Sequence, residues 1–370
     1  MGSSVLISGA GVGGSTLAYW LALHGFAVTV VERAAGQRSS GNPVDVKGPA
    51  VAVAEQMGIM SQLRAAATTV NRLTFLDVTG RERAAVSTSA FQDSAGEREV
   101  EIARADLAAI LLAAARDHAE IRWGDTITGL TQTGGGVEAT FERGAPAHFD
   151  LVVGADGLHS TVRRLAFGPE SEFVQHMGMF VATLRVDRLI ADDRTVAMVN
   201  LPGRALAVHP TTGIPMAAFM FRHPAVPGFD HRDLALHKRL VTQAYAGQLG
   251  GYEEFVDQVN AAEDLYFDSV SRVRLPHWAN GRITLVGDAA SSLSLFGDGS
   301  TLAIAGAHTL AEELARTPGD TSGALQRYEQ RHRELVASKL RGFAVAGRFL
   351  VPRTRTAIAM RNTATRLLRR

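Results

Sequence analysis

Short apolar runs and one segment of helical periodicity open the chain. The run Val5–Ile7 leads into the glycine-rich stretch 9–14, after which apolar residues recur at helical spacing as far as His24. A second run, 28–31, consists of β-branched residues and ends at Glu32. The order strand, turn, helix and strand predicts a βαβ unit.

A different pattern fills the middle of the chain, where short apolar runs are separated by polar stretches or by turns that contain Pro or Gly. These runs predict strands of an antiparallel sheet at 180–186, 195–200, 206–209, 215–221 and 266–273. The pattern also indicates a hairpin over 73–101 and helices over 106–118, 231–247, 252–262 and 300–316.

The change of pattern predicts an α/β fold, in which a Rossmann-like domain is interrupted by a mostly antiparallel sheet domain. The first domain is built from both ends of the chain, over residues 1–72, 99–175 and 276–337. The inserted sheet domain takes residues 73–98 and 176–275. We expect residues 338–370 to form a basic C-terminal helix that bridges the two domains.

Composition narrows the class of protein. The chain has 370 residues, of which 46% are hydrophobic and none is Cys, so disulfides, thiolate catalysis, zinc fingers and iron–sulfur clusters are excluded. The histidines have no metal-binding spacing, and we expect no metal. No apolar stretch approaches the roughly 20 residues of a membrane span, and the N-terminus lacks a signal peptide pattern, which predicts a cytoplasmic protein.

Positive charge is concentrated at the C-terminus. Residues 338–370 hold nine of the 38 Lys and Arg residues and no acid, leaving 29 basic against 37 acidic residues elsewhere. Such a segment suits nucleic acid or an anionic surface. The alternative, which we favour, is a packed helix with a solvated basic face. We therefore expect no nucleic-acid partner and no stable membrane insertion.

The glycine-rich stretch has the spacing Gly9-x-Gly11-x-x-Gly14 between a strand and a helix. Gly9 permits the tight turn, Gly11 lets a pyrophosphate approach the backbone, and Gly14 lets helix and strand pack closely. Glu32, at the end of the next strand, would accept hydrogen bonds from ribose hydroxyls and repel a 2′-phosphate. The motif predicts a site for FAD or NAD rather than NADP.

Two further motifs place carboxylates at strand ends. Asp156 follows the apolar run 151–153, and Asp288 follows the run 283–286 and precedes Gly299 at the start of a helix. Carboxylates at the carboxyl edge of a parallel sheet lie where ligands of open α/β sheets bind. The alternative is that each Asp only caps a strand-to-helix turn.

These three motifs, in this order, resemble those of the FAD-dependent aromatic hydroxylases, which have the para-hydroxybenzoate hydroxylase fold. Within that family, the chain is most similar to the tetracycline-inactivating flavin monooxygenases. The resemblance implies that FAD is bound by residues of all these motifs and of three further segments, namely Gly9, Gly11, Gly14, Glu32, Arg33, Asp45, Arg104, Asp156, Asp288 and Gly299.

The resemblance also suggests a reductant and a substrate site. Arg38 matches an arginine linked to NADPH, and Arg204 matches an arginine that faces the substrate pocket. His209 would donate or accept a hydrogen bond with a phenolic substrate, or would only be a satisfied histidine at a strand end. Arg204 would hold an anionic or enolate oxygen, or would only be a surface turn residue.

The implied activity is that of a single-component, NAD(P)H-reduced FAD monooxygenase. Reduced flavin and molecular oxygen would give a C4a-hydroperoxide, which hydroxylates an aromatic or polycyclic phenolic or enolic molecule. The chain departs from the family at Ser291, where the family has His, and at Ser294 and Leu295, where it has Pro. Baeyer–Villiger or other flavin chemistry, and a non-catalytic FAD-binding interaction protein, remain open, as does a monomer or a homodimer.

Overall fold

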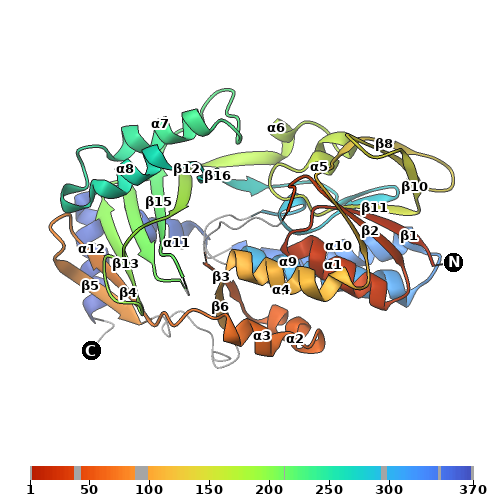
Figure 1. Cartoon of the computed structure of the whole chain (residues 1–370), viewed down its shortest axis with the longest axis horizontal. Helices are drawn as coiled ribbons and strands as arrows, with labels where there is room; N and C mark the ends of the chain where they lie inside the picture. The colour runs from red at the N-terminus through yellow and green to blue at the C-terminus, as the bar shows by residue number, and fades with distance from the viewer. Residues whose placement is uncertain are drawn as a thin grey trace.

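The computed structural model shows two parts lying side by side in an elongated molecule, one around a parallel sheet and one around a larger antiparallel sheet (Figure 1). It describes residues 2–36, 43–87, 99–211, 213–292, 298–340 and 343–367. The two ends of the chain lie at opposite ends of the molecule (Figure 1). The fold is therefore the interrupted α/β arrangement predicted from the sequence.

A six-stranded sheet forms the centre of the first part. In spatial order its strands are β17 (Ala279–Asn280), β18 (Ile283–Leu285), β11 (Leu151–Gly154), β1 (Ser4–Ser8), β2 (Ala27–Glu32) and β7 (Glu120–Trp123). All neighbours pair in parallel except β17 and β18. Strands β1, β11 and β18 are buried almost throughout, as expected for a sheet that helices cover on its faces.

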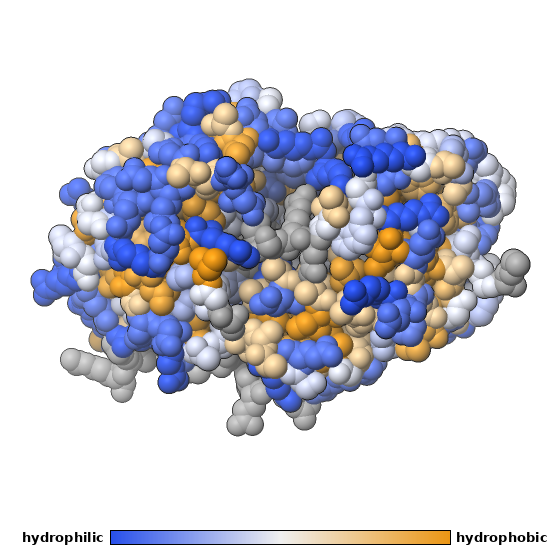
Figure 2. Space-filling view, viewed as in Figure 1, coloured by the Kyte–Doolittle hydropathy of each residue, from blue (hydrophilic) through white to orange (hydrophobic). Residues whose placement is uncertain are grey.

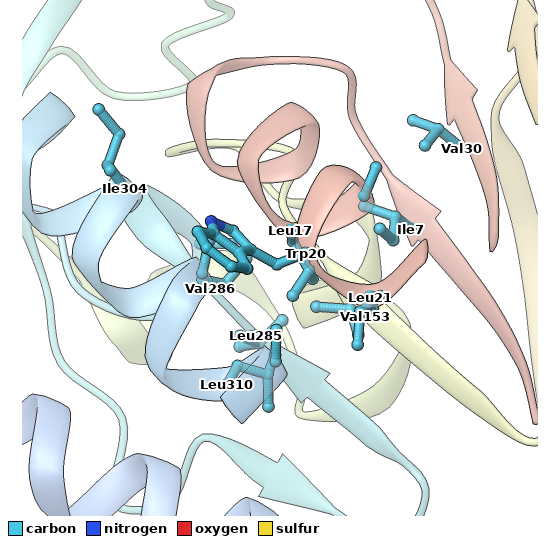
Figure 3. Packing of buried hydrophobic residues seen from close by; sticks show 14 of the residues in the cluster. Ile7, Leu17, Trp20, Leu21, Val30, Val153, Leu285, Val286, Ile304 and Leu310 are labelled. Atoms are coloured by element: carbon cyan, nitrogen blue, oxygen red, sulfur yellow. The ribbon is translucent and has the colours of Figure 1, made fainter. Parts of the chain in front are cut away.

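Helices pack on this sheet and on one another. Contacts join α1 (Val12–Leu23) to α4 (Arg104–Arg116) and to α9 (Asp298–Arg316), and join α9 to α10 (Thr321–Leu340). The interior is apolar, with Leu17 and Leu21 of α1 packed near Val153, Leu285 and Leu310 (Figure 3). Burial of these side chains fixes α1 against the strands that precede the predicted binding motifs.

Smaller elements complete the first part. Strands β3 (Pro43–Val46) and β6 (Val100–Ala103) form an antiparallel pair, and β8 (Ile127–Gln132), β9 (Val137–Phe141) and β10 (Ala147–Phe149) form a three-stranded sheet. The short helices are α2 (Pro49–Gln56), α3 (Met60–Ala65), α5 (Thr161–Ala166) and α6 (Glu170–Phe173). On the face shown in Figure 2, apolar side chains gather over α4.

The second part is built on a seven-stranded sheet. In spatial order its strands are β16 (Tyr266–Val273), β12 (Val174–Arg185), β15 (Met216–Arg222), β14 (Arg204–His209), β13 (Thr195–Leu201), β4 (Arg72–Leu76) and β5 (Glu82–Ser87). All neighbours are antiparallel except β4 and β13. The hairpin β4–β5 thus forms one edge of this sheet, but it is shorter than the predicted hairpin over 73–101, because residues 100 and 101 pair with β3 instead.

The two faces of the seven-stranded sheet have different coverings. Helices α7 (Leu234–Tyr245) and α8 (Glu254–Ala261) pack on the face that carries Phe219 and Phe221. The opposite face, which we call the methionine face, carries Met179, Met198 and Met220 and meets Val351 from the C-terminal segment. Because side chains alternate along a strand, each strand contributes to both faces.

The C-terminal segment differs from the single bridging helix expected from the sequence. It forms α11 (Phe343–Leu350) and α12 (Arg355–Leu367), separated at Pro352, whose carbonyl oxygen accepts a hydrogen bond of 2.7 Å from Gly203 N. Proline cannot donate a backbone hydrogen bond and ends the first helix there. The expected solvated basic face is also incomplete, because Arg361 is buried.

Candidate active site

Four neighbouring parallel strands end at one edge of the six-stranded sheet, and each is followed by or ends in a predicted motif residue. Gly9 follows β1 and Glu32 ends β2. Asp156 follows β11, and Asp288 follows β18. Since these strands are adjacent in the order β18-β11-β1-β2, the three sequence motifs meet at the carboxyl edge where α/β proteins bind ligands.

The glycine turn leaves no space for side chains at two of its three glycines. Gly9 has a φ of +102°, and a Cβ there would lie 2.7 Å from the carbonyl oxygen of Ala155. A Cβ on Gly14 would lie 1.9 Å from the carbonyl oxygen of Gly9. Gly11 is different, because an added Cβ would meet no atom within 4 Å. The turn is therefore closely packed at Gly9 and Gly14 and open at Gly11.

The N-terminus of α1 is suited to an anion. Gly11 is its N-cap residue, no side chain caps the helix, and its first turn holds no acid. Glu32 lies beside the turn and accepts hydrogen bonds of 2.9 Å from the backbone N–H groups of Ala10 and Ala34. Free N–H groups, an open glycine and a fixed carboxylate fit the pyrophosphate and ribose of a dinucleotide.

Asp156 is held by its own part of the chain. Its carboxylate accepts hydrogen bonds from Ser160 Oγ at 2.5 Å, Val162 N at 3.1 Å and Ser8 Oγ at 3.3 Å. Burial raises the pKa of Asp156, and the hydrogen bonds oppose that rise. These contacts fit the capping role left open by the sequence, and they fix the loop after β11 next to the glycine turn.

Arg163 joins two of the motifs, and its role was not predicted from the sequence. Its side chain is fully buried and donates hydrogen bonds to the carbonyl oxygen of Leu158 and, at 3.1 Å, to that of Ala289. Leu158 follows Asp156, and Ala289 follows Asp288. A planar guanidinium with several donors is suited to such a bridge. The one signal in the sequence was an arginine three residues after Ser160.

Asp288 lies in a single helical turn, Gly287–Ala289, near two other predicted residues. A Cβ added to Gly299 at the start of α9 would be 3.8 Å from Asp288 Oδ1. Burial raises the pKa of Asp288, and the positive charge of Arg104 at the start of α4 opposes the rise. The structure therefore brings Asp288, Gly299 and Arg104 together.

Asp45 lies on β3 and is tied to the first turn of α9. Its carbonyl oxygen accepts hydrogen bonds from Ser300 Oγ at 2.7 Å and Thr301 Oγ1 at 3.2 Å. Lys47 Nζ lies 3.2 Å from Asp45 Oδ2 and 3.3 Å from Asp298 Oδ1. Burial lowers the pKa of Lys47, but the two carboxylates outweigh it and raise the pKa. Lys47 was not predicted as a site residue.

A cluster of charged and histidine side chains joins the two parts of the molecule. His159 Nδ1 lies 3.0 Å from Glu170 Oε1, and its Nε2 lies 3.2 Å from Asp268 Oδ1 on β16. The ring of His159 stacks on that of His231 with centroids 3.9 Å apart. Arg33 is exposed at the end of β2 and helps to lower the pKa of His231.

The pKa values of the two histidines in this cluster are shifted in opposite directions. Burial alone would lower the pKa of His159, but Asp268 and Glu170 raise it to about 9. Burial and the neighbouring charge of His159 lower the pKa of His231 to about 4. At neutral pH the stack thus pairs one imidazolium with one neutral ring.

The structure separates the two predicted substrate residues. Arg204 and His209 are five positions apart on β14, so they point to opposite faces of the sheet. Arg204 lies on the side of α7, where its charge acts on Tyr245. His209 shares the methionine face with Ala205 and Ala207. The two predicted substrate residues therefore do not share one face of the sheet, and Arg204 does not lie on the methionine face.

His209 has the surroundings of a neutral histidine. Its Nδ1 is buried and has no hydrogen-bond partner among the described residues. Burial lowers the pKa of His209 to about 4. Thr183 Oγ1, on the same face of the sheet, is likewise buried without a partner within the described ranges. Buried polar atoms are usually hydrogen-bonded, so both are candidates to bind a ligand.

Some predicted positions lie outside the described residues, namely Arg38, Ser294 and Leu295. Ser291 is described, and its backbone N–H donates a hydrogen bond of 2.9 Å to the carbonyl oxygen of Gly287. Across the described part of the chain, no group of three or more His, Cys, Asp or Glu side chains is arranged to hold a metal ion. Nor does any described helix combine the length and apolar character that crossing a membrane requires.

Comparisons with known proteins agree with this geometry. A sequence family described as an FAD binding domain matches residues 2–343. A flavin-dependent monooxygenase of Legionella longbeachae is 31% identical over 358 residues, covering 94% of this chain and 90% of that protein. A flavin-dependent monooxygenase from an unknown prokaryotic organism is 32% identical over 332 residues, covering 88% and 84%. The crystal structure of tetracycline destructase Tet(51) superposes with a TM-score of 0.86 at 26% identity, covering 100% of this chain and 96% of that one.

Proposed function

Since this chain belongs to the FAD-binding family that includes the flavin-dependent monooxygenases, we propose that it hydroxylates an aromatic or polycyclic phenolic or enolic small molecule at the expense of NAD(P)H and molecular oxygen. The observation that carries the proposal is the meeting of three cofactor motifs at one sheet edge, with the open Gly11 and the uncapped N-terminus of α1 at its centre.

FAD fits the residues at this edge. The N-terminus of α1 would hold the pyrophosphate, Glu32 the ribose, and Asp288 with Gly299 the chain that leads to the flavin ring. Asp45, which accepts a hydrogen bond from Ser300, and Arg104, whose charge acts on Asp288, would complete the binding site. Bound FAD supplies the redox chemistry that activates oxygen, and the protein positions the substrate and excludes water.

The reductant would dock transiently. The sequence contains one dinucleotide fingerprint, and if FAD occupies it, NADPH has no Rossmann unit of its own. Arg38 remains the proposed NADPH residue on the resemblance alone. Arg38→Ala should slow the reduction of bound flavin by NADPH while the FAD content stays unchanged, as stopped-flow absorbance would measure. An unchanged rate would refute the assignment.

The methionine face is the proposed wall of the substrate pocket. Methionine side chains adapt to irregular apolar ligands, and His209 and Thr183 offer buried polar atoms that lack partners within the described chain. The neutral imidazole of His209 would donate or accept one hydrogen bond with a phenolic or enolic oxygen. The likeness to a tetracycline destructase supports a polycyclic substrate.

The test is NADPH oxidation in air by the FAD-loaded protein, with a panel of phenolic polycycles that includes tetracycline. We expect a compound that accelerates NADPH oxidation and yields a product heavier by one oxygen atom. Product structure distinguishes ring hydroxylation from Baeyer–Villiger insertion, which gives an ester or lactone. Flavin that NADPH does not bleach would instead favour a non-catalytic FAD-binding protein and contradict the proposal.

A further inference from the structure

Helix α12 buries three polar residues and exposes two large apolar ones, although some of its other polar residues are also exposed and Ile358 is half-buried. Arg361, Asn362 and Thr365 are buried against the second part of the molecule. Met360 and Leu367 are 69% and 66% exposed. In the usual arrangement the large apolar side chains of a surface helix face the core, so the exposure of Met360 and Leu367 is unusual.

The inward contacts fix this orientation. Arg361 donates hydrogen bonds to Asn200 Oδ1 at 2.9 Å and to the carbonyl oxygen of Phe349 at 3.0 Å. It also bonds Asn362 Oδ1, and its guanidinium lies 3.7 Å from the ring centre of Phe75. Rotating the helix to bury Met360 would break the contacts with Asn200, Phe349 and Phe75, so the inward contacts set which side of α12 faces outward.

Three of the outward residues form a short apolar stripe, with exposed threonines and arginines around it. Met360, Ala364 and Leu367 are spaced by four and three positions, which puts them on one side of the helix, and all three are exposed. Exposed arginines lie before and beside the stripe, namely Arg353, Arg355 and Arg366. No acidic residue occurs between 338 and 370. We call this surface the α12 outer face.

We propose that the α12 outer face binds the surface of a bilayer that contains anionic phospholipid. The apolar stripe would enter the boundary between headgroups and acyl chains, and the arginines would contact the headgroup phosphates. Binding of this kind is peripheral and does not need a membrane-spanning helix. The charge pattern selects this partner, because two copies of the face would bring like charges together. Nucleic acid would use the arginines but would leave the apolar stripe in water.

Flotation of the full-length, FAD-loaded protein with lipid vesicles tests the proposal. We expect the protein to float with vesicles of phosphatidylcholine and phosphatidylglycerol at low salt, not with phosphatidylcholine alone, and to be released by high salt. Met360→Glu with Leu367→Glu should abolish flotation. Each of Arg353→Gln and Arg355→Gln should lower the partition coefficient about fivefold.

Ile214→Glu is the matched control, because Ile214 is 55% exposed on the same part of the molecule and lies outside the basic segment. It should float as the unchanged protein does. FAD content and unfolding midpoint report whether each variant is folded. Absence of flotation with anionic vesicles would overturn the proposal, as would equal loss in the control.

Two other outcomes would assign the surface differently and also overturn the proposal. One is salt-sensitive binding to duplex DNA that falls with Arg353→Gln and not with Met360→Glu, in a protein that does not float. The other is a dimer, seen by sedimentation, that Met360→Glu dissociates while flotation is unaffected.

Discussion

Gly11 and Gly14 lie three residues apart in one turn, yet there is room for a side chain at Gly11 and none at Gly14. The space beside Gly11 is open, whereas a Cβ on Gly14 would collide with the backbone at Gly9. The first glycine is therefore free to serve a ligand, and the last serves the packing of α1. A single motif thus combines a binding role and a structural role that mutation can separate.

Gly11→Val should leave the fold intact and impair cofactor binding, because the added side chain fills only the open space. We expect an unfolding midpoint of the apoprotein close to that of the unchanged chain, with FAD lost on gel filtration. Gly14→Ala is the contrasting variant and should lower the free energy of unfolding by about 1–3 kcal/mol through overpacking. Full flavin occupancy in Gly11→Val would refute the position of the pyrophosphate.

Arg163→Lys should weaken the link between the loops after β11 and β18. Lysine keeps the charge but loses the planar donors, leaving a buried carbonyl unpaired, which costs about 1–3 kcal/mol. FAD content and urea unfolding measure the effect. Arg164→Lys is the control, because Arg164 is the exposed neighbour in the same helix. Equal behaviour of the two variants would contradict a bridging role for Arg163.

Single residues divide into those that the sequence reveals and those that it does not. Glu32, Asp156 and Asp288 were predicted because each stands at the end of an apolar run, a local property. Lys47 depends on Asp298, far along the chain, so no local pattern marks it. The face of Arg204 could not be predicted, because a turn residue next to a strand gives no sign of which face of the sheet its side chain lies on.

At the scale of elements, the C-terminal segment shows how a proline and one arginine reshape an expected helix. Pro352 separates α11 from α12, and Arg222 donates hydrogen bonds of 2.9 and 3.1 Å to the carbonyl oxygens of Val351 and Gly347 near the end of α11. A cation at the C-terminus of a helix is favoured by the helix dipole. The hydrogen bonds of Arg222 thereby hold the end of α11 on the second part of the molecule.

Arg361→Met should loosen α12. The substitution removes the hydrogen bonds to Asn200 and Phe349 and leaves their acceptors buried, and we expect a loss of about 2–4 kcal/mol in the free energy of unfolding. Faster cleavage within α12 by a limiting amount of trypsin or chymotrypsin would show local release. Arg355→Met, at an exposed position, should behave as the unchanged protein. The opposite order of effects would argue against Arg361 as the anchor.

Element types were largely predictable because their patterns are periodic. Strands β13, β14, β15 and β16 and helices α4, α7, α8 and α9 lie within a few residues of their predicted bounds, whereas β12 begins six residues before its predicted start. The parallel pairing of β4 with β13 was not foreseen, since a hairpin can join a sheet at either edge and direction. The inward side of α12 was likewise hidden, because its apolar side suggests burial and the tertiary contacts of Arg361 override it.

At the scale of the whole molecule, His159 links the two parts, because it contacts Glu170 of the first part and Asp268 of the second. Its pKa of about 9 exceeds the unfolded value of about 6.5, so its contribution to stability is complete below pH 6.5 and is lost as the pH rises through 9. His231, with a pKa of about 4, contributes fully above pH 6.5 and less as the pH falls toward 4. Together the two pKa shifts predict that the contact between the two parts of the molecule is most stable near pH 6.5.

Asp268→Asn should reduce the loss of stability that occurs as the pH rises above 6.5. Removing the carboxylate lowers the pKa of His159, so the loss of stability between pH 6.5 and 9 should shrink by about 1–2 kcal/mol. Urea unfolding at several pH values measures it. Asp264→Asn is the control on the same approach to β16, at an exposed position. An identical pH profile in the Asp268 variant would refute the assignment.

The interrupted order of the parallel sheet has a consequence for how the protein is made. Strand β1 pairs with β11, and β11 pairs in turn with β18, which is synthesised much later, at residues 283–285. The other sheet combines β4 and β5, at residues 72–87, with strands as late as β16, at residues 266–273. At about 5–20 residues per second, a ribosome would need tens of seconds to release these partners. During that time the glycine turn is already outside the exit tunnel without its neighbours, so the cofactor site can be completed only after β18 and the start of α9 have emerged.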